Sequence, residues 1–270
     1  MGAEGGGDYL DRKAASVRAL RSTQAPSGAE LERLMSEALG APEPPSFAAA
    51  LREGPGVAVI AEFKRRSPSG GSLVEGEDPL TVAGQYAEGG AACLSVLTDA
   101  EDFGGSLGDL TRVTDGVGLP VLRKDFITDG AAVWEARAAG AAAVLLIVGM
   151  LDGGELRSLL RAADGAGLDA VVEVHDTREC DRALEAGARI VGVNNRDLRS
   201  LTTDLAVTEE VAPGVPGEVT LVSESGIRTP EDVSRVRDAG ADAVLVGEAL
   251  MRLDPAARRQ RVRALGSVVR

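Results

Sequence analysis

Short apolar runs alternate with amphipathic segments from residue 57 onward, and this alternation limits the chain to few folds. Strands that are apolar on both faces and separated by helices form parallel sheets covered by helices. Eight such units within about 200 residues predict an α/β fold, a single (β/α)8 barrel of the TIM type. The strand candidates are VAVIAE, ACLSVL, LPVLRK, AAVLLIV, DAVVEV, RIVGVN, VTLVS and DAVLVG.

The turn after the first strand candidate argues against the main alternative, an open doubly wound sheet. That fold normally has a GxGxxG turn at this point, whereas this chain has KRRSPSGG. No Ser/Pro-rich or single-charge linker follows residue 50. We therefore expect residues 53–270 to form one barrel domain.

Residues 1–52 precede the barrel pattern and are predicted to form a helical extension. Ser27 and Glu30 make a capping box that opens SGAELERLMSEAL, and the earlier segment DYLDRKAASVRAL also has helical periodicity. Periodicity alone fits two roles equally well, a cover over one barrel mouth and a packing extension.

Composition argues against several classes of partner. The formal net charge of −13 repels polyanions, so nucleic acid is not an expected partner. No run reaches the roughly 18 uncharged apolar residues of a membrane span, and the N-terminus lacks the pattern of a secretory signal. Cys93 and Cys180 are interpreted as unpaired thiols of a reducing compartment, and no His/Cys/carboxylate cluster has metal-ligand spacing. We expect a cytoplasmic protein without a metal ion, with a monomer as the working assumption.

Lysine is rare in this chain, and its placement suggests chemistry. Only three of the 29 basic residues are lysine, and Lys64 and Lys124 directly follow apolar strand candidates. An ammonium group can give up a proton, whereas a guanidinium group stays protonated in proteins.

Charged and polar residues gather at the ends of the strand candidates. In a (β/α)8 barrel the carboxyl ends of the strands and the loops after them build the active site. Three carboxylates and three cations would then balance around one cavity, where neighbouring charges push pKa values apart and so separate acids from bases. The residues at these ends are Glu62, Lys64, Lys124, Glu173, Asn194, Arg196, Glu224, Ser225 and Gly247.

Two late loops have the features of a phosphate site. Ser225 and Gly226 precede a helix that begins near Pro230, and Gly247 opens a second helix. In barrels the loops after strands seven and eight often bind phosphate with backbone N–H groups and a helix N-terminus. We expect Glu248 to offer its N–H while its carboxylate turns away. Ser67, in the turn after the first strand, is a candidate for an added hydroxyl contact.

Other distinctive residues receive structural interpretations. We favour a packing role in a loop over catalysis for His175, the only histidine, and we expect Trp134 to pack against the sheet. The residues expected in loops or helix caps are Asp99, Asp102 and Asp125.

An ordered series of motifs resembles the indole-3-glycerol phosphate synthase family over about residues 8–255. The motifs are VIAEFKRRSPSGG, LSVLTDAEDFGGSL, LPVLRKDFITD, VVEVHD, VGVNNRDL, LVSESGI and VGEALM. The resemblance implies a cofactor-free ring closure in tryptophan biosynthesis. A phosphorylated small molecule, 1-(2-carboxyphenylamino)-1-deoxyribulose 5-phosphate, would become indole-3-glycerol phosphate with loss of carbon dioxide and water.

The resemblance also implies a role for each matched residue. Lys124 would be the general acid, Glu173 the base or proton relay, and Lys64 the partner of the substrate carboxylate, held by Glu62. Asn194 and Arg196 would bind and orient the substrate, and Glu224 would anchor sugar hydroxyls. The N-terminal helices would cover the mouth and exclude water. The residues implied around the phosphate are Ser67, Ser225, Gly226, Gly247 and Glu248.

Two other functions compete with this one, because a barrel does not determine its chemistry. A sugar-phosphate isomerase needs one base and one electrophile, so a second lysine and Arg196 would be surplus. A non-catalytic phosphosugar-binding barrel would need the phosphate loops but would have no use for Lys124.

Overall fold

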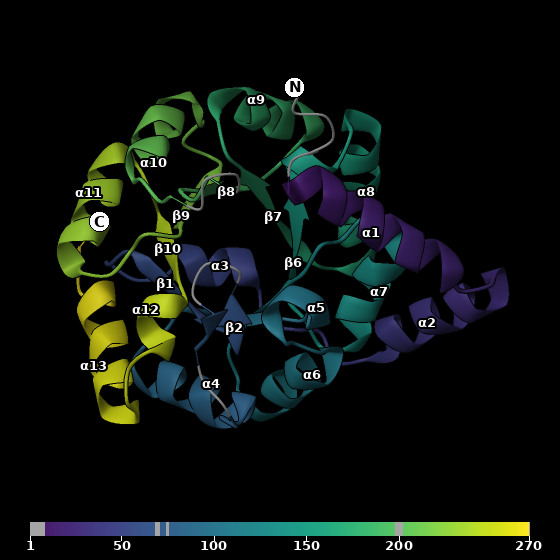
Figure 1. The fold of residues 1–270 in the computed structure, drawn as a ribbon, viewed down its shortest axis with the longest axis horizontal. Helices are drawn as coiled ribbons and strands as arrows, with labels where there is room; N and C mark the ends of the chain where they lie inside the picture. Colours follow the sequence, from purple (N-terminus) through teal and green to yellow (C-terminus); the bar gives the residue numbers. More distant parts are fainter. Residues whose placement is uncertain (1–8, 68–70, 74–75, 198–201, 270) are drawn as a thin grey trace, which may run out of the picture.

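Eight parallel strands close into a barrel surrounded by helices (Figure 1). The computed structural model describes residues 9–67, 71–73, 76–197 and 202–269. The barrel strands are β1 (Ala58–Phe63), β4 (Cys93–Leu97), β5 (Val121–Lys124), β6 (Ala143–Ile147), β7 (Asp169–Val174), β8 (Ile190–Asn194), β9 (Thr220–Glu224) and β10 (Ala243–Val246). The predicted (β/α)8 barrel is confirmed.

The strand register shows how the barrel closes. Each strand pairs in parallel with the next one along the chain, and β1 pairs with both β4 and β10. Ile60 of β1 lies opposite Cys93 on one side and Leu245 on the other. Ile60 and Cys93 are fully buried, because the strand faces point to the packed interior or to the helices.

The helices around the barrel begin and end with local signals. Aspartates cap α7, α8 and α9 at their N-termini, and glycines in the left-handed conformation end α8, α9 and α11. These helices cover the sheet from outside. Their bounds are α4 (Pro79–Glu88), α6 (Leu107–Gly116), α7 (Gly130–Ala138), α8 (Gly153–Ala166), α9 (Thr177–Ala186), α10 (Ala206–Val211), α11 (Pro230–Ala239) and α13 (Pro255–Gly266).

Several short elements lie in the loops between strands and helices. An antiparallel hairpin, β2 (Arg66–Ser67) with β3 (Gly71–Ser72), follows β1. The others are α5 (Ala100–Phe103), α12 (Glu248–Met251) and the 3-10 turns η1 (Val148–Met150) and η2 (Ala212–Gly214).

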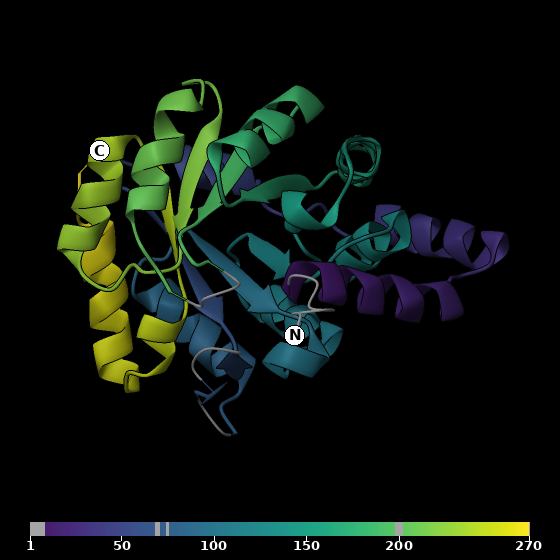
Figure 2. The same cartoon turned by 45° about the horizontal axis from the view of Figure 1, so that its top comes forward.

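The extension forms three helices that dock at different places: α1 (Tyr9–Thr23), α2 (Gly28–Gly40) and α3 (Phe47–Arg52). The capping box of Ser27 and Glu30 is present at the start of α2. Helix α3 lies across the amino-terminal end of the barrel, where the backbone N–H of Ala48 donates to Asp169 at the start of β7. Helices α1 and α2 project together to one side of the barrel (Figures 1 and 2).

Helix α1 reaches the opposite end, beside the carboxyl ends of the strands. Arg18 donates a hydrogen bond to the carbonyl oxygen of Met150 in η1, and Tyr9 and Leu10 line the cavity described below. The docking of α3 could not be predicted, because helical periodicity does not say which surface a helix covers.

Among the described residues, no helix combines the length and the apolar character that crossing a membrane requires.

Candidate active site

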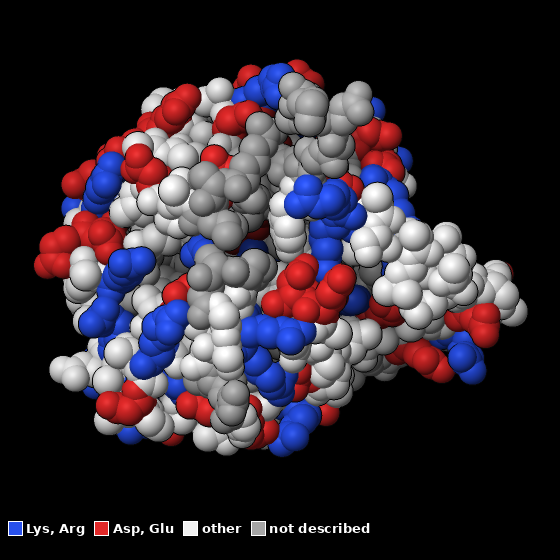
Figure 3. All heavy atoms as spheres, viewed as in Figure 1, with Lys and Arg blue, Asp and Glu red and all other residues white. Residues whose placement is uncertain are grey.

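The carboxyl ends of the strands open into a cavity of about 740 Å³. Figure 3 looks onto this face and shows lysine and arginine side chains gathered around a central hollow. The cavity is lined by seven basic and five acidic side chains, although the whole chain carries a formal charge of −13. This local excess of positive charge suits an anionic ligand, and it exceeds the balance that we expected from the strand ends.

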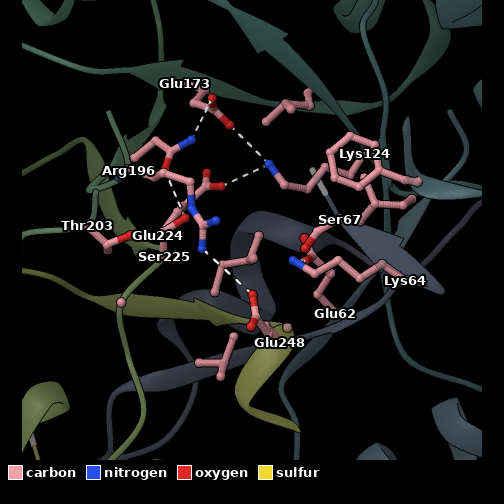
Figure 4. Close-up of a pocket in the computed structure, with 18 of the residues that line it drawn as sticks. Glu62, Lys64, Ser67, Lys124, Glu173, Arg196, Thr203, Glu224, Ser225 and Glu248 are labelled. Atoms are coloured by element: carbon pink, nitrogen blue, oxygen red, sulfur yellow. Dashed lines mark hydrogen bonds and ion pairs between the residues drawn. The ribbon is translucent and has the colours of Figure 1, made fainter. Parts of the chain in front are cut away.

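A partly buried lysine lies between two carboxylates at the centre of the site (Figure 4). Lys124 Nζ lies 3.0 Å from Glu173 Oε2 and 3.0 Å from Glu224 Oε2. Asn194 Nδ2 donates to the other oxygen of Glu173 over 3.1 Å. Lys124, Glu173 and Glu224 thus come together as predicted from their places at strand ends.

The charged residues at the centre come from alternate strands. Glu62 is on β1, Lys124 on β5, Glu173 on β7 and Glu224 on β9. In (β/α)8 barrels alternate strands supply the four side chains of one interior layer. The charged layer is therefore an ordinary barrel layer built from ionisable residues in place of apolar ones.

Burial and neighbouring charges push the pKa values in this layer apart. Burial lowers the pKa of Lys124, but the carboxylates of Glu173, Glu224 and Glu62 outweigh it, so the net effect raises this pKa. Burial raises the pKa of Glu224 to about 7, against the opposing effect of Lys124. The pKa of Glu173 is lowered, because Lys124, His175 and Asn194 together outweigh its burial. One carboxylate is thus held ionised while the other titrates near neutral pH.

The second active-site lysine forms its own ion pair. Lys64 Nζ lies 2.6 Å from Glu62 Oε1, and the Glu62 carboxylate is buried. Gly247 leaves the space for this pair, since a Cβ atom there would lie 2.2 Å from Glu62 Oε1 and 3.1 Å from Lys64 Nζ. A side chain at position 247 would therefore displace the Glu62 carboxylate from this ion pair.

Arginines flank the carboxylate of Glu248. Arg252 Nη2 lies 2.9 Å from Glu248 Oε1, and Arg196 Nη2 lies 3.9 Å from Glu248 Oε2. Burial raises the pKa of Glu248, but the opposite effect of Arg252, Lys64 and Arg196 is larger. The pKa is therefore lowered overall, and the carboxylate stays ionised. We expected this carboxylate to turn away from the phosphate loops; it lies along the cavity wall, where the arginines neutralise it.

The loop after β9 has an unusual backbone. Ser225 has a φ of 64° and is the one non-glycine residue with positive φ among the residues that the structure describes. Its hydroxyl donates to Asn194 Oδ1 over 2.9 Å, and Gly226 follows with a φ of 87°. Helix α11 begins at Pro230 and α12 at Glu248, as expected. Turns of this kind direct successive N–H groups toward an anion.

Ser67 lines the same cavity and lies on the hairpin strand β2, where it is buried. The rest of the SPSGG turn up to Gly70 lies outside the described residues.

Comparison with known proteins identifies the family. Residues 7–265 match the family model of indole-3-glycerol phosphate synthase. The chain belongs to this family. The resemblance noted from the sequence motifs is thereby confirmed.

Curated relatives named indole-3-glycerol phosphate synthase are about half identical to this chain. The relative from Streptomyces griseus is 49% identical over 82% of both chains. The relative from Mycolicibacterium smegmatis is 50% identical over 82% of this chain and 81% of its own. The relative from Opitutus terrae is 52% identical over 80% of this chain and 84% of its own.

Solved structures with low sequence identity share the barrel fold alone. Thiamine phosphate pyrophosphorylase from Pyrococcus furiosus has a TM-score of 0.58 at 16% identity, covering 77% of this chain and 93% of its own. N-acetylmannosamine-6-phosphate 2-epimerase from Clostridium perfringens has a TM-score of 0.56 at 17% identity, covering 76% of this chain and 92% of its own.

Aromatic residues form one wall of the cavity in this member of the indole-3-glycerol phosphate synthase family, and sequence reasoning missed them. The ring centroids of Tyr9 and Phe126 are 6.4 Å apart, and those of Phe103 and Phe126 are 6.2 Å apart. All three line the cavity and suit a flat aromatic ligand. The sequence contained a signal for this wall, because aromatic residues are few in the chain and Phe103 and Phe126 come after strands.

Arginines at the rim were also missed. Arg228 and Arg252 line the cavity, and Arg252 lies four residues after Glu248 on a helical path. That spacing predicts an ion pair on one helix face and was available from the sequence.

The remaining predictions concern packing and caps. Trp134 is buried on α7, which confirms packing, and Asp99 caps α5 as expected. His175 Nε2 lies 3.5 Å from Glu173 Oε1 and its Nδ1 lies 3.2 Å from Glu179 Oε2. The histidine therefore touches the charged layer in addition to packing after β7. Among the described residues, no group of three or more His, Cys, Asp or Glu side chains is placed to hold a metal ion.

Proposed function

We propose that this chain converts 1-(2-carboxyphenylamino)-1-deoxyribulose 5-phosphate into indole-3-glycerol phosphate, carbon dioxide and water, a step of tryptophan biosynthesis. Membership of the indole-3-glycerol phosphate synthase family supports this carboxy-lyase activity. The observation that carries the mechanism is the Lys124 ammonium held between the carboxylates of Glu173 and Glu224 inside a positively charged cavity.

Lys124 acts as the general acid of ring closure. The aromatic carbon that bears the carboxylate attacks the ketone carbon, and the π electrons of the C=O bond move onto its oxygen. This oxygen takes a proton from Lys124 and becomes a hydroxyl. An alkoxide is far more basic than an amine, so an ammonium with a raised pKa still donates its proton to the developing alkoxide. Loss of carbon dioxide then returns the electron pair to the aromatic ring.

Glu173 serves the dehydration that follows. The hydroxyl takes a proton from the Lys64 ammonium, which solvent then restores, and leaves as water, while a proton is removed from the neighbouring carbon so that the new double bond forms. A carboxylate with a lowered pKa that lies 3.0 Å from Lys124 can accept this proton and return one to the lysine. Ammonium and carboxylate thus supply acid and base from one contact.

Lys64 and Glu62 bind the other end of the reacting centre. The Lys64 ammonium pairs with the substrate carboxylate and assists proton transfer, while Glu62 holds the lysine over 2.6 Å. Asn194 and Arg196 orient the substrate, and Glu224 anchors sugar hydroxyls.

The phosphate is bound by the late loops, and α1 covers the bound substrate. Tyr9 and Leu10 of α1 line the cavity, which supports a role of residues 1–52 in excluding water. The proposed phosphate contacts are Ser67, Ser225, Gly226, Gly247 and the N–H of Glu248.

The reaction consists of proton transfers and carbon–carbon and carbon–oxygen bond changes, so we assign it no cofactor and no metal. We further propose that the protein works in the cytoplasm as a monomer, with its phosphorylated substrate as its partner and without nucleic acid or membrane.

The test is the appearance of indole absorbance and fluorescence when purified protein meets the anilino-deoxyribulose phosphate. The Lys124→Met variant is the matched control, because it removes the acid while keeping the length of the side chain. Absence of an indole signal with the wild-type protein would refute the proposal.

A further inference from the structure

A second asparagine follows Asn194 and points away from the cavity. Successive side chains of a strand point to opposite faces, so Asn194 reaches the charged layer while Asn195 lies between β8, β9 and α10. Asn195 is 1% exposed and does not line the cavity. Its contacts nevertheless lead to residues that do.

The Asn195 amide group is fully hydrogen-bonded in one orientation. The two hydrogens of Nδ2 serve three acceptors, so one of them is shared: Ser223 Oγ at 2.9 Å and the backbone carbonyls of Glu224 and Ser225 at 2.9 and 3.1 Å. Oδ1 accepts from the N–H and the hydroxyl of Thr208 over 3.1 and 2.8 Å. Exchanging the amide N and O would set oxygen against two carbonyls, so these contacts fix the orientation.

These bonds hold the strained turn of the phosphate loop. Ser225 adopts the left-handed conformation, which costs a non-glycine residue free energy and persists where its surroundings enforce it. Asn195 binds the carbonyl oxygens on both sides of the Ser225 N–Cα–C unit, those of Glu224 and Ser225. The asparagine therefore restrains both backbone dihedrals that set the direction of the next N–H groups.

The same residue ties this turn to the loop after β8. The backbone N–H of Asn195 donates to the Glu224 carbonyl over 2.9 Å, and its carbonyl accepts from Asp204 over 3.0 Å. A Cβ atom on Gly226 would lie 2.8 Å from Thr203 Cγ2, so the two loops are in close contact. Both loops supply lining residues, Thr203 from one and Ser225 from the other.

We propose that Asn195 is a positioning residue that preorganises the Ser225–Gly226 turn for the phosphate group, through its side-chain hydrogen bonds to the two carbonyls. This inference rests on the proposed function for the identity of the substrate. The part of the inference that concerns phosphate binding does not depend on the proposed function. Preorganisation of this kind strengthens binding, because folding already supplies the free energy that the strained conformation costs. Ligand binding then does not have to supply it.

The test compares Asn195→Ala with Thr208→Val. The alanine variant removes both bonds to the carbonyls and leaves room for a water, whereas the valine variant removes hydroxyl contacts of the same buried network and keeps those two bonds. Inorganic phosphate binding is measured by calorimetry without substrate, thermal unfolding is measured for each variant, and KM and kcat are measured with the anilino-deoxyribulose phosphate.

For Asn195→Ala we expect the phosphate Kd and the KM to rise about tenfold while kcat changes by less than about threefold. For Thr208→Val we expect a lower unfolding temperature with phosphate Kd within about twofold of the wild type. A purely structural role of Asn195 would lower stability in both variants alike and leave both Kd values unchanged, and that result would overturn the proposal. If Asn195→Ala does not fold, Asn195→Ser takes its place with the same expectation.

Failure of the two proposals is distinguishable. Wild-type protein that binds phosphate but makes no indole product would refute the ring closure and leave the role of Asn195 to be decided by the calorimetry. Normal turnover together with unchanged phosphate Kd in a folded Asn195 variant would refute the role of Asn195 alone. Wild-type protein that does not bind phosphate would also overturn it.

Discussion

The ammonium nitrogen of Lys124 lies 3.0 Å from a carboxylate oxygen of Glu173, although the two residues are 49 positions apart in the sequence. Barrel closure creates this contact, because β5 and β7 are alternate strands whose ends point into one layer. The proposed proton donor and acceptor are therefore in direct hydrogen-bond contact. This contact supports the proposed sequence, in which Lys124 donates a proton to the substrate and Glu173 later accepts one from it.

Replacing Lys124 with methionine should reduce kcat by about 100- to 10,000-fold, because the general acid is lost. Inorganic phosphate affinity should remain close to that of the wild type, since the phosphate loops do not use this side chain. Steady-state kinetics and calorimetry check the two parts. Lys124→Arg should fail to restore turnover, because guanidinium is a poor proton donor. Full activity of the arginine variant would contradict proton transfer from this position.

Glu224 should make the protein less stable as the pH rises toward neutrality. Its pKa in the folded protein is about 7, against a reference value of 4.5. Between these values the folded state keeps a proton that the unfolded state has lost. The free energy of unfolding therefore falls with rising pH, by at most about 1.4 kcal/mol per pH unit from this group.

The check is urea unfolding of the wild type and of Glu224→Gln between about pH 5 and pH 7. Glutamine cannot titrate, so the wild-type free energy of unfolding should decline more steeply with pH than that of the variant. Titrating groups far from Glu224 are common to both proteins and cancel in the comparison, whereas His175, whose pKa the Glu224 carboxylate helps to raise, adds a difference of the same sign. Equal slopes would show that Glu224 does not titrate in this range.

Strand ends were the part of the site that the sequence predicted well. Glu62, Lys124 and Glu173 end apolar runs, and the carboxyl ends of parallel strands must meet at one end of a barrel. The argument needed only strand positions, which hydrophobic patterns indicate. Topology predicted that these side chains meet in one cavity, whereas the pairing of Lys124 with both glutamates is seen in the structure.

Contacts that depend on docking could not be predicted in the same way. Alternation along a strand predicts that Asn195 points away from the face of Asn194, but only the packing of α10 shows what Asn195 contacts: Thr208 and the carbonyls of Glu224 and Ser225. The third lysine, Lys13, lies on a helix whose periodicity says nothing about the carboxylates of α5 that it binds. Such contacts arise from tertiary packing and have no local pattern.

Gly247→Ala should damage the Lys64–Glu62 pair without unfolding the protein. The backbone φ of Gly247 is −121°, outside the left-handed region that favours glycine, but an alanine Cβ would lie 2.2 Å from Glu62 Oε1. Because we propose that this pair takes part in catalysis, its displacement should lower kcat/KM by about 10- to 100-fold.

The matched control is Gly84→Ala on α4, where the added Cβ meets no atom within 4 Å. That substitution should keep full activity and raise the free energy of unfolding by about 0.4–1 kcal/mol. Kinetics and urea unfolding of both variants separate a local displacement from a general effect of alanine. Wild-type kcat/KM in Gly247→Ala would show that the space at this position is not needed.

Lys13→Met should loosen α1 from the mouth of the barrel. The buried Lys13 ammonium lies 2.9 Å from Asp99 and 2.7 Å from Asp102, both associated with α5, and 4.9 Å from the centre of the Phe126 ring. Methionine fills similar space but leaves these carboxylates without their partner, so the free energy of unfolding should fall by about 2 kcal/mol. The KM should rise as well, because α1 supplies cavity-lining side chains.

The matched control for Lys13→Met is Arg33→Met on α2. This substitution breaks an exposed ion pair in which Arg33 Nε lies 3.8 Å from Glu37 Oε1. It should cost less than about 0.5 kcal/mol and leave KM unchanged, because solvent and salt screen exposed pairs. Urea unfolding and steady-state kinetics of the two variants make the comparison. If Lys13→Met matched the control in both measurements, α1 would not depend on Lys13 for its position at the mouth.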